Sequence, residues 1–195
     1  GGVAAIDFDG DGWPDLFFNQ GGNISYASSP ARVSGDVGAT DKLYRNQGGA
    51  PWLDVTDRAG LVDGYYGQGV AVGDVDADGW PDLYVANVGQ NLLWLNNGDG
   101  TFSCLESDEF SNAVGWTTSV VLADFNNDSL LDIYDVNYAP LDLIRTKMCK
   151  VGDASVPCDS LAQLSGGQDQ LFVSDGDGTF TNVTNSCGVQ LPDGI

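Results

Sequence analysis

A two-part pattern occurs three times along the 195-residue chain and constrains the fold more than any other feature. In the middle copy the first part reads GVAVGDVDADGWPDLYVAN and the second part reads NLLWLNNGDGTF. The first part occupies residues 1–20, 67–87 and 117–137, and the second part occupies residues 41–61, 90–110 and 169–189. Self-similarity at this spacing predicts an array of similar structural units.

Each unit is expected to contain four short strands. The apolar runs alternate with turns rich in Asn, Asp and Gly, which are hairpin signals, and no stretch has a helical period. A repeated four-stranded antiparallel meander is typical of a propeller blade. We therefore predict an all-β, propeller-type array of three four-stranded antiparallel blades at residues 1–66, 67–112 and 113–190, followed at 191–195 by a tail or the start of a next blade.

Two insertions distinguish the outer units from the middle one. They lengthen the connection between the second and third strands, at residues 20–40 and 138–168. In an up-and-down blade this connection lies opposite the loop between the first and second strands, so both insertions are expected on one face. The second insertion carries three of the seven cationic residues, and loops on a rigid scaffold are frequent binding surfaces. The alternative is that both are solvated loops, one of them pinned by a disulfide.

The repeat resembles the FG-GAP or VCBS repeat of integrin alpha-chain propellers and of secreted proteins similar to cartilage acidic protein. The resemblance is carried by GVAVGDVDADGWPDLYVAN and NLLWLNNGDGTF and covers nearly the whole chain apart from the insertions. It implies closed rings of about seven blades. Three blades are too few to close such a ring alone.

An aspartate-rich loop follows the first strand of each unit, with the spacing D-x-D-x-D-G-x-x-D in the first two copies. Side chains at positions 1, 3 and 5 converge, the glycine permits a sharp bend, and the last carboxylate closes the shell. Such an all-oxygen set suits Ca²⁺, whereas Mg²⁺ prefers a tighter octahedron with more water. Flanking strands and an acid at position 9 instead of 12 argue against an EF-hand. Aspartates that only stabilise turns are the alternative.

About three calcium ions are predicted, one for each loop. The third loop is expected to bind more weakly or slowly, because Asn126 removes a charge and Ser129 replaces the glycine. The predicted ligands, with the backbone carbonyl of the seventh residue included, are Asp7, Asp9, Asp11, Trp13 and Asp15; Asp74, Asp76, Asp78, Trp80 and Asp82; and Asp124, Asn126, Asp128, Leu130 and Asp132.

Two further runs, NNGDGTF and SDGDGTF, resemble cation loops but fall between the third and fourth strands. We interpret them as hairpin turns and assign no metal role to Asp99, Asp175 or Asp177. Aromatic residues also recur at matching positions, and we expect them to pack between blades. They are Trp13, Trp80, Tyr84, Trp94, Phe102, Phe172 and Phe180.

Composition excludes several classes of function. The formal net charge of -21 argues against nucleic acid and anionic membrane surfaces as partners. No apolar run is long enough for membrane insertion. The chain contains no histidine, G-x-S-x-G elbow, phosphate loop or H-E-x-x-H motif, so we predict that it is not an enzyme. A calcium-dependent polysaccharide-degrading enzyme is the less favoured alternative.

The cysteines and sequons favour an extracellular, secreted or cell-surface location. Four cysteines fit an oxidising compartment with up to two disulfides. We expect Cys149 to pair with Cys158 and Cys104 with Cys187, with free buried thiols as the alternative. Asparagines of N-x-S/T sequons add weak support, and those considered for glycosylation are Asn23 and Asn182. A start at Gly1 without a leader is typical of a processed or truncated chain.

These features together predict a calcium-stabilised extracellular adhesion or structural module. It is expected to bind protein or glycan and to assemble with copies of itself, because an open array of blades leaves edges and faces uncovered. Such contacts would complete a ring or propagate into a filament. The alternative is a fragment of a larger receptor-like propeller.

Overall fold

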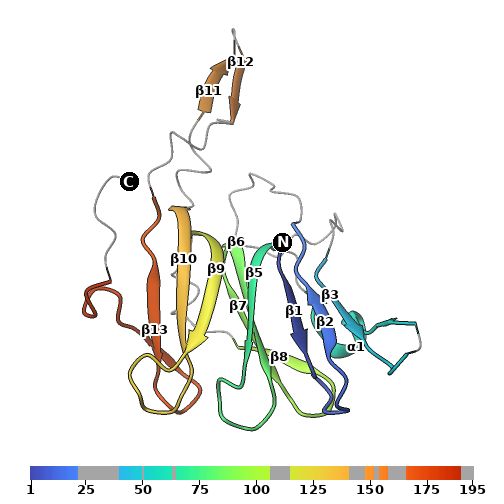
Figure 1. The fold of residues 1–195 in the computed structure, drawn as a ribbon. Helices are drawn as coiled ribbons and strands as arrows, with labels where there is room; N and C mark the ends of the chain where they lie inside the picture. Colours follow the sequence, from blue (N-terminus) through green and yellow to red (C-terminus); the bar gives the residue numbers. More distant parts are fainter. Residues whose placement is uncertain are drawn as a thin grey trace.

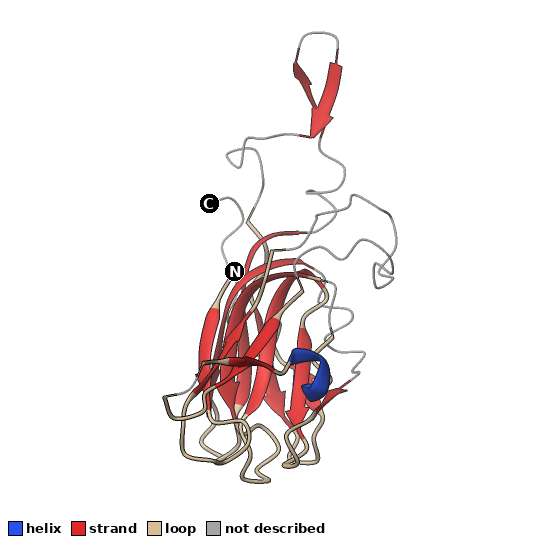
Figure 2. Ribbon diagram, turned by 90° about the vertical axis from the view of Figure 1, so that its right-hand side faces the viewer, coloured by secondary structure: helices blue, strands red, loops and turns tan. Residues whose placement is uncertain are grey.

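Antiparallel β-strands make up nearly all the regular structure, which confirms the predicted all-β class (Figures 1 and 2). The computed structural model describes residues 1–21, 40–49, 51–62, 65–105, 115–140, 148–151, 154–157 and 166–189, with the segments 148–151 and 154–157 described by their backbone alone. Among these residues the one helix is α1 (Thr56–Ala59), a single turn that ends where Gly60 adopts a left-handed φ of 78°. So short a helix leaves no period in the sequence.

The first sheet is a meander in which each strand pairs with the next strand along the chain. Leu16 pairs with both Ala5 and Tyr44, so apolar positions of neighbouring strands come into line. Its strands are β1 (Val3–Ile6), β2 (Asp15–Phe18), β3 (Lys42–Arg45) and β4 (Leu53–Asp54).

The second and third meanders have the same order and are joined into one sheet. The second consists of β5 (Tyr66–Gly73), β6 (Asp82–Gly89), β7 (Leu92–Asn96) and β8 (Phe102–Leu105). The third consists of β9 (Gly115–Ala123), β10 (Asp132–Pro140), β13 (Gln170–Ser174) and β14 (Phe180–Asn182). Val88 on β6 pairs with Trp116 on β9, which joins them. The strand order agrees with the predicted one, while the exact blade boundaries stay a prediction.

A two-stranded hairpin lies within the predicted second insertion. It pairs β11 (Met148–Val151) with β12 (Ala154–Pro157) and belongs to neither larger sheet. Figures 1 and 2 show it at the end of the molecule opposite the loops that join β1 to β2, β5 to β6 and β9 to β10. These three aspartate loops therefore share one end of the molecule.

Two apolar clusters hold neighbouring meanders together. One combines side chains of the first and second meanders, such as Phe17, Leu43 and Leu83, and the other combines the second and third. Burial of each large apolar side chain contributes about 1.5–3 kcal/mol. Five of the aromatics expected between blades are buried in these clusters, namely Tyr84, Trp94, Phe102, Phe172 and Phe180. Trp13, in contrast, is 51% exposed.

The predicted disulfide between Cys104 and Cys187 is wrong. Cys104 lies on β8 and Cys187 follows β14, and these strands stand at opposite ends of the eight-stranded sheet. A disulfide needs Cα atoms within about 7 Å. Cys187 is free and exposed, and its thiol donates to the carbonyl oxygen of Thr184 at 3.4 Å.

Other predictions fall beyond the described side chains. Cys158 and the sequon residue Asn23 lie outside the described residues, so the second disulfide and glycosylation at Asn23 stay predictions. Asn182 is exposed at the end of β14, where its glycosylation also stays a prediction. Among the described residues no helix is long and apolar enough to cross a membrane.

Candidate metal centre

A buried aspartate closes each aspartate loop and ties it to the third strand of its unit. In the second unit Asp82 accepts hydrogen bonds from the backbone N–H of Val75 and of Asn96, both at 2.8 Å. The other units repeat the pair: Phe8 and Asn46 donate to Asp15 at 3.2 and 2.8 Å, and Phe125 and Ser174 donate to Asp132 at 2.8 and 2.9 Å. These closing aspartates thus fix where each loop leaves and rejoins the sheet.

Burial changes the acidity of the closing aspartates. Desolvation raises the pKa of Asp82 to about 6, while the two backbone N–H groups act in the opposite direction. Burial also raises the pKa of Asp15. A cation in the loop would favour the ionised carboxylate, because opposite charge at short range lowers an acid's pKa.

The second loop gathers three carboxylates. Oxygens of Asp74, Asp76 and Asp78 lie within 4.8 Å of one another. Backbone N–H groups of the same loop hold this arrangement: Gly79 donates to Asp74 at 2.9 Å and Trp80 donates to Asp78 at 2.8 Å. Like charges at this separation repel one another. A hard cation bound between these carboxylates would attract all three and offset their mutual repulsion.

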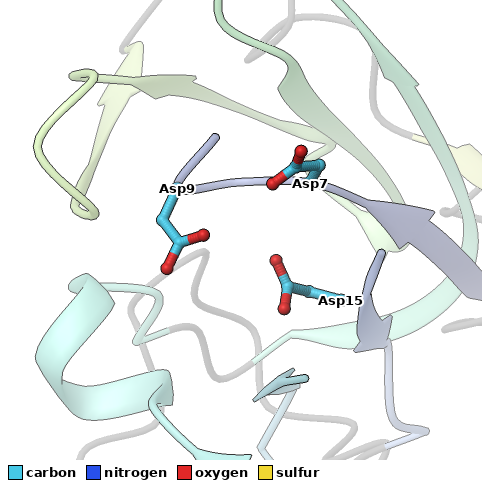
Figure 3. Close-up of side chains that lie close together, drawn as sticks. All are labelled: Asp7, Asp9 and Asp15. Carbon is cyan, nitrogen blue, oxygen red and sulfur yellow. The ribbon is translucent and has the colours of Figure 1, made fainter. Parts of the chain in front are cut away.

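The first loop brings together Asp7, Asp9 and Asp15, whose carboxylates are turned toward a common space in Figure 3. One oxygen of Asp7 and one of Asp9 are buried with no hydrogen-bond partner among the described residues. Buried acceptors without donors are costly, and an all-oxygen set of carboxylates is what Ca²⁺ takes in proteins. The residues of this loop therefore fit a calcium ion.

Asp11, the third aspartate of the first loop, stands apart from that cluster and contacts Arg45 at the end of β3. The Nη2 of Arg45 donates to Asp11 Oδ2 at 2.9 Å, and its Nε lies 2.5 Å from Asp9 Oδ2. The carboxylate of Asp9 raises the pKa of this guanidinium. The sequence-based prediction did not connect Arg45 with this loop. Arg45 is nevertheless the one charged residue at the fourth position of the matching runs KLYRN, LLWLN and QLFVS.

The third loop is organised differently. The Nδ2 of Asn126 donates to Asp128 Oδ2 at 2.8 Å, and the N–H of Ser129 donates to Asp124 at 2.9 Å. Ser129 lies at φ 74° where the other loops have glycine, a conformation that costs a non-glycine residue energy. The three-acid groups within 4.8 Å among the described residues belong to the first two loops alone. Weaker binding here stays a prediction, as do the carbonyl ligands of Trp13, Trp80 and Leu130.

The glycine-rich turns between third and fourth strands are hairpin turns, as predicted. The backbone N–H of Asn97 donates to the carbonyl oxygen of Thr101, and the backbone N–H of Asp175 donates to that of Thr179, both at 2.9 Å. Asp99 caps the first of these turns by accepting the N–H of Thr101 at 3.1 Å.

A pocket of about 300 Å³ lies beside the first loop, between the first and second units. It combines two guanidinium groups and two carboxylates with an apolar lining. The lining residues are Phe8, Asp9, Arg45, Val55, Arg58, Gly98, Asp99 and Gly100.

Comparison with known proteins places these loops in a family context. The profile of the FG-GAP-like repeat matches residues 7–85 and 74–134. The chain is 30% identical over 151 residues to cartilage acidic protein 1 of Xenopus tropicalis, covering 75% of this chain and 23% of that protein. It is 35% identical over 86 residues to integrin alpha-6 of Gallus gallus, covering 43% of this chain and 7% of that protein.

One relative is named as an enzyme, a phosphatidylinositol-glycan-specific phospholipase D of Bos taurus, which is 30% identical over 157 residues, covering 67% of this chain and 17% of that protein. A solved structure of an Agrocybe aegerita lectin, described by its recognition of non-reducing terminal N-acetylglucosamine, aligns with a TM-score of 0.46 and 19% identity, covering 94% of this chain and 38% of the lectin. The chain spans less than a quarter of the length of these curated relatives. By its matches over more than half of its residues, the chain belongs to the FG-GAP-like repeat family.

Proposed function

We propose that the chain is a calcium-stabilised extracellular adhesion or structural module that acts by binding and self-assembly. The observation that carries the calcium part is the convergence of carboxylates in the first two loops, with buried oxygens that lack donors in the first. Family membership supports an adhesion-type role, since an integrin and a cartilage acidic protein are among the relatives. We propose that these carboxylates act as metal ligands, and we propose no reaction for them.

Calcium would act on the fold through the loops. Asp74, Asp76 and Asp78 would hold the ion, while Asp82 keeps the loop attached to β7 through Asn96. The ion supplies the positive charge that lets these carboxylates stay close together. An ion that binds the folded chain and not the unfolded chain stabilises the fold by about 2.7 kcal/mol per site when the free ion is at 100 times its Kd.

The contact between the first and second units suggests how copies would assemble. The Nδ2 of Asn96 donates to the carbonyl of Phe8 at 2.9 Å, and the Phe8 and Phe102 ring centroids are 6.2 Å apart. The Trp80 ring lies so close to Gly10 that a Cβ there would be 3.0 Å from it. The second unit thus contacts the first through Trp80, Asn96 and Phe102.

The first and third units each expose one of the two surfaces that form this contact. At the repeat positions of Trp80, Asn96 and Phe102 the first unit has Trp13, Asn46 and Trp52. Both of these tryptophans are exposed. In the third unit Phe125 takes the place of Phe8, and it is 50% exposed whereas Phe8 is 3% exposed. These complementary ends support a head-to-tail contact between copies, which gives a ring where the rotation closes and a filament where it does not.

Light scattering with calcium and after chelation tests the assembly. We expect the 20.5 kDa chain to form oligomers or polymers in calcium. Trp52→Ser and Phe125→Ser should each abolish polymerisation, and an equimolar mixture of the two variants should give a dimer, because one intact end of each kind remains. A monomeric wild-type chain would contradict self-assembly and favour a segment of a longer propeller.

Thermal unfolding of the same samples tests the calcium part separately. Chelation should lower the Tm of a variant that no longer assembles, such as Phe125→Ser, because loss of the ion removes its binding free energy. An unchanged Tm in chelator would contradict calcium stabilisation whatever the oligomeric state.

A further inference from the structure

Arg45 gives the first loop a cation that is built into the chain. Its guanidinium lies 2.5 Å from Asp9 Oδ2 and donates to Asp11 Oδ2 at 2.9 Å. Arginine keeps its charge at every accessible pH and presents several donors to carboxylates in a fixed geometry. Two of the predicted metal ligands are therefore already neutralised in part by a side chain from β3.

The other loops have no such partner at this position. Leu95 ends the run that corresponds to KLYR in the second unit, and Val173 stands there in the third. In the second loop the aspartates at positions 1, 3 and 5 converge, whereas in the first loop the position-5 aspartate, Asp11, is turned to Arg45 and lies outside the cluster. Two loops with identical aspartate spacing therefore differ in whether an arginine holds the position-5 aspartate.

We propose that Arg45 competes with calcium for the first loop, so that the second loop fills at lower calcium concentration and the first loop fills only when the guanidinium is displaced. This inference rests on the proposed calcium binding. A divalent ion entering beside Arg45 meets a like charge, shares Asp9 with the guanidinium, and must break the hydrogen bond from Arg45 before Asp11 can turn to it. Among the described residues no ion pair involves the second loop, so these costs do not arise there. When calcium is absent, Arg45 takes its place in holding the first loop together.

Calorimetric titration with CaCl₂ of the chain carrying Phe125→Ser, which keeps it from assembling, tests the competition. We expect this background to show a tight second-loop site and a first-loop site at least tenfold weaker, with the predicted weak binding of the third loop common to every variant. Arg45→Leu, which installs the second unit's residue type, should strengthen the weak site about tenfold. Arg45→Gln, which keeps the side chain's length without its charge, should act in the same direction. Arg58→Leu is the matched control, because it removes an equal charge beside the same pocket without contacting the aspartates in the described ion pairs.

Melting in chelator supplies a second readout that needs no calcium. Arg45→Leu should lower the Tm there, because Asp9 and Asp11 lose their counter-ion, whereas Arg58→Leu should leave it unchanged. Equal Tm values for the two variants in chelator, or a titration that Arg45→Leu leaves unchanged, would overturn the competition.

Asp76→Ala separates this inference from the calcium proposal. Loss of the tight site in Asp76→Ala, together with no effect of Arg45→Leu, would overturn the role of Arg45 and leave calcium binding intact. Calcium uptake that appears only in Arg45→Leu would contradict calcium binding by the native second loop and support the role of Arg45. Absence of uptake in every variant would overturn both.

Discussion

Aspartate side chains have opposite environments in the exposed loops and in the interior of the large sheet. In the second loop three carboxylates converge near solvent and are held by backbone N–H groups of their own loop. In the sheet, Asp135 on β10 is completely buried. Its Oδ2 accepts hydrogen bonds from the hydroxyl of Tyr84 at 2.9 Å and from the side-chain amide of Asn91 at 2.7 Å. Its other oxygen has no hydrogen-bond partner among the described residues.

The difference shows that local solvent and donors decide what an aspartate does here. Burial raises the pKa of Asp135 to about 7, so its neutral form is favoured in the sheet over most of the acid range. In the loops a mobile cation can reach the carboxylates and offset their charge. The closing aspartates are intermediate, because they are buried as Asp135 is but accept two backbone N–H groups each.

Replacement of a closing aspartate should have the largest effect. Asp82→Ala leaves the N–H groups of Val75 and Asn96 buried without acceptors, which costs about 4 kcal/mol in the free energy of unfolding. Denaturant unfolding in chelator isolates this structural cost from metal binding. A loss below about 1 kcal/mol in that experiment would mean that the closing aspartates act only as metal ligands.

Asp135 should produce the next largest effect, through pH. Folded Asp135 holds its proton up to about pH 7, whereas an unfolded aspartate releases it near pH 4. The native state therefore binds more protons between these values, and stability should fall as pH rises, by about 3 kcal/mol between pH 5 and pH 8.

Asp135→Asn is the variant that isolates this group. It should abolish that part of the pH dependence and be more stable than the wild type at pH 8. The comparison is made in chelator, and Asp82, whose raised pKa acts in the same direction, is present in both proteins. A pH profile identical in both proteins would mean that Asp135 stays ionised in the fold, and the contrast between loop and sheet would then be lost.

The sequence predicted the parts of this molecule that depend on local pattern. Strand alternation and the turns of NNGDGTF gave the meander order. The D-x-D-x-D spacing located the three carboxylates that converge in the second loop, whereas in the first loop Asp11 lies apart. Contacts across long sequence separations could not be read in this way. The contact of Arg45 with Asp11, and the burial of Asp135 against Tyr84, depend on strands 34 and 51 residues away.

The predicted Cys104–Cys187 disulfide failed for a related reason. Pairing cysteines by elimination ignores which strands the sheet brings together, and here they end at opposite sides of the sheet. Asp135 itself stands in an apolar strand where the other units have Val85 and Phe18, so only its departure from the repeat could have drawn attention to it.

The smallest effect should come from the loop aspartates, and it should depend on calcium. Asp76→Ala removes a carboxylate from the second loop and should cost about 2 kcal/mol of stability in saturating calcium, because the ion's binding free energy is reduced. Asp99→Ala is the matched control, since Asp99 caps a plain hairpin turn by accepting from Thr101, and it should cost about 0.5 kcal/mol or less. In chelator Asp76→Ala should become neutral or slightly stabilising, because removing one carboxylate relieves repulsion from Asp74 and Asp78. Equal losses for the two variants in calcium would place the metal ligands elsewhere, whereas a loss at Asp76 that persists in chelator would mean that this loop, like the sheet, uses its aspartates only for hydrogen bonding.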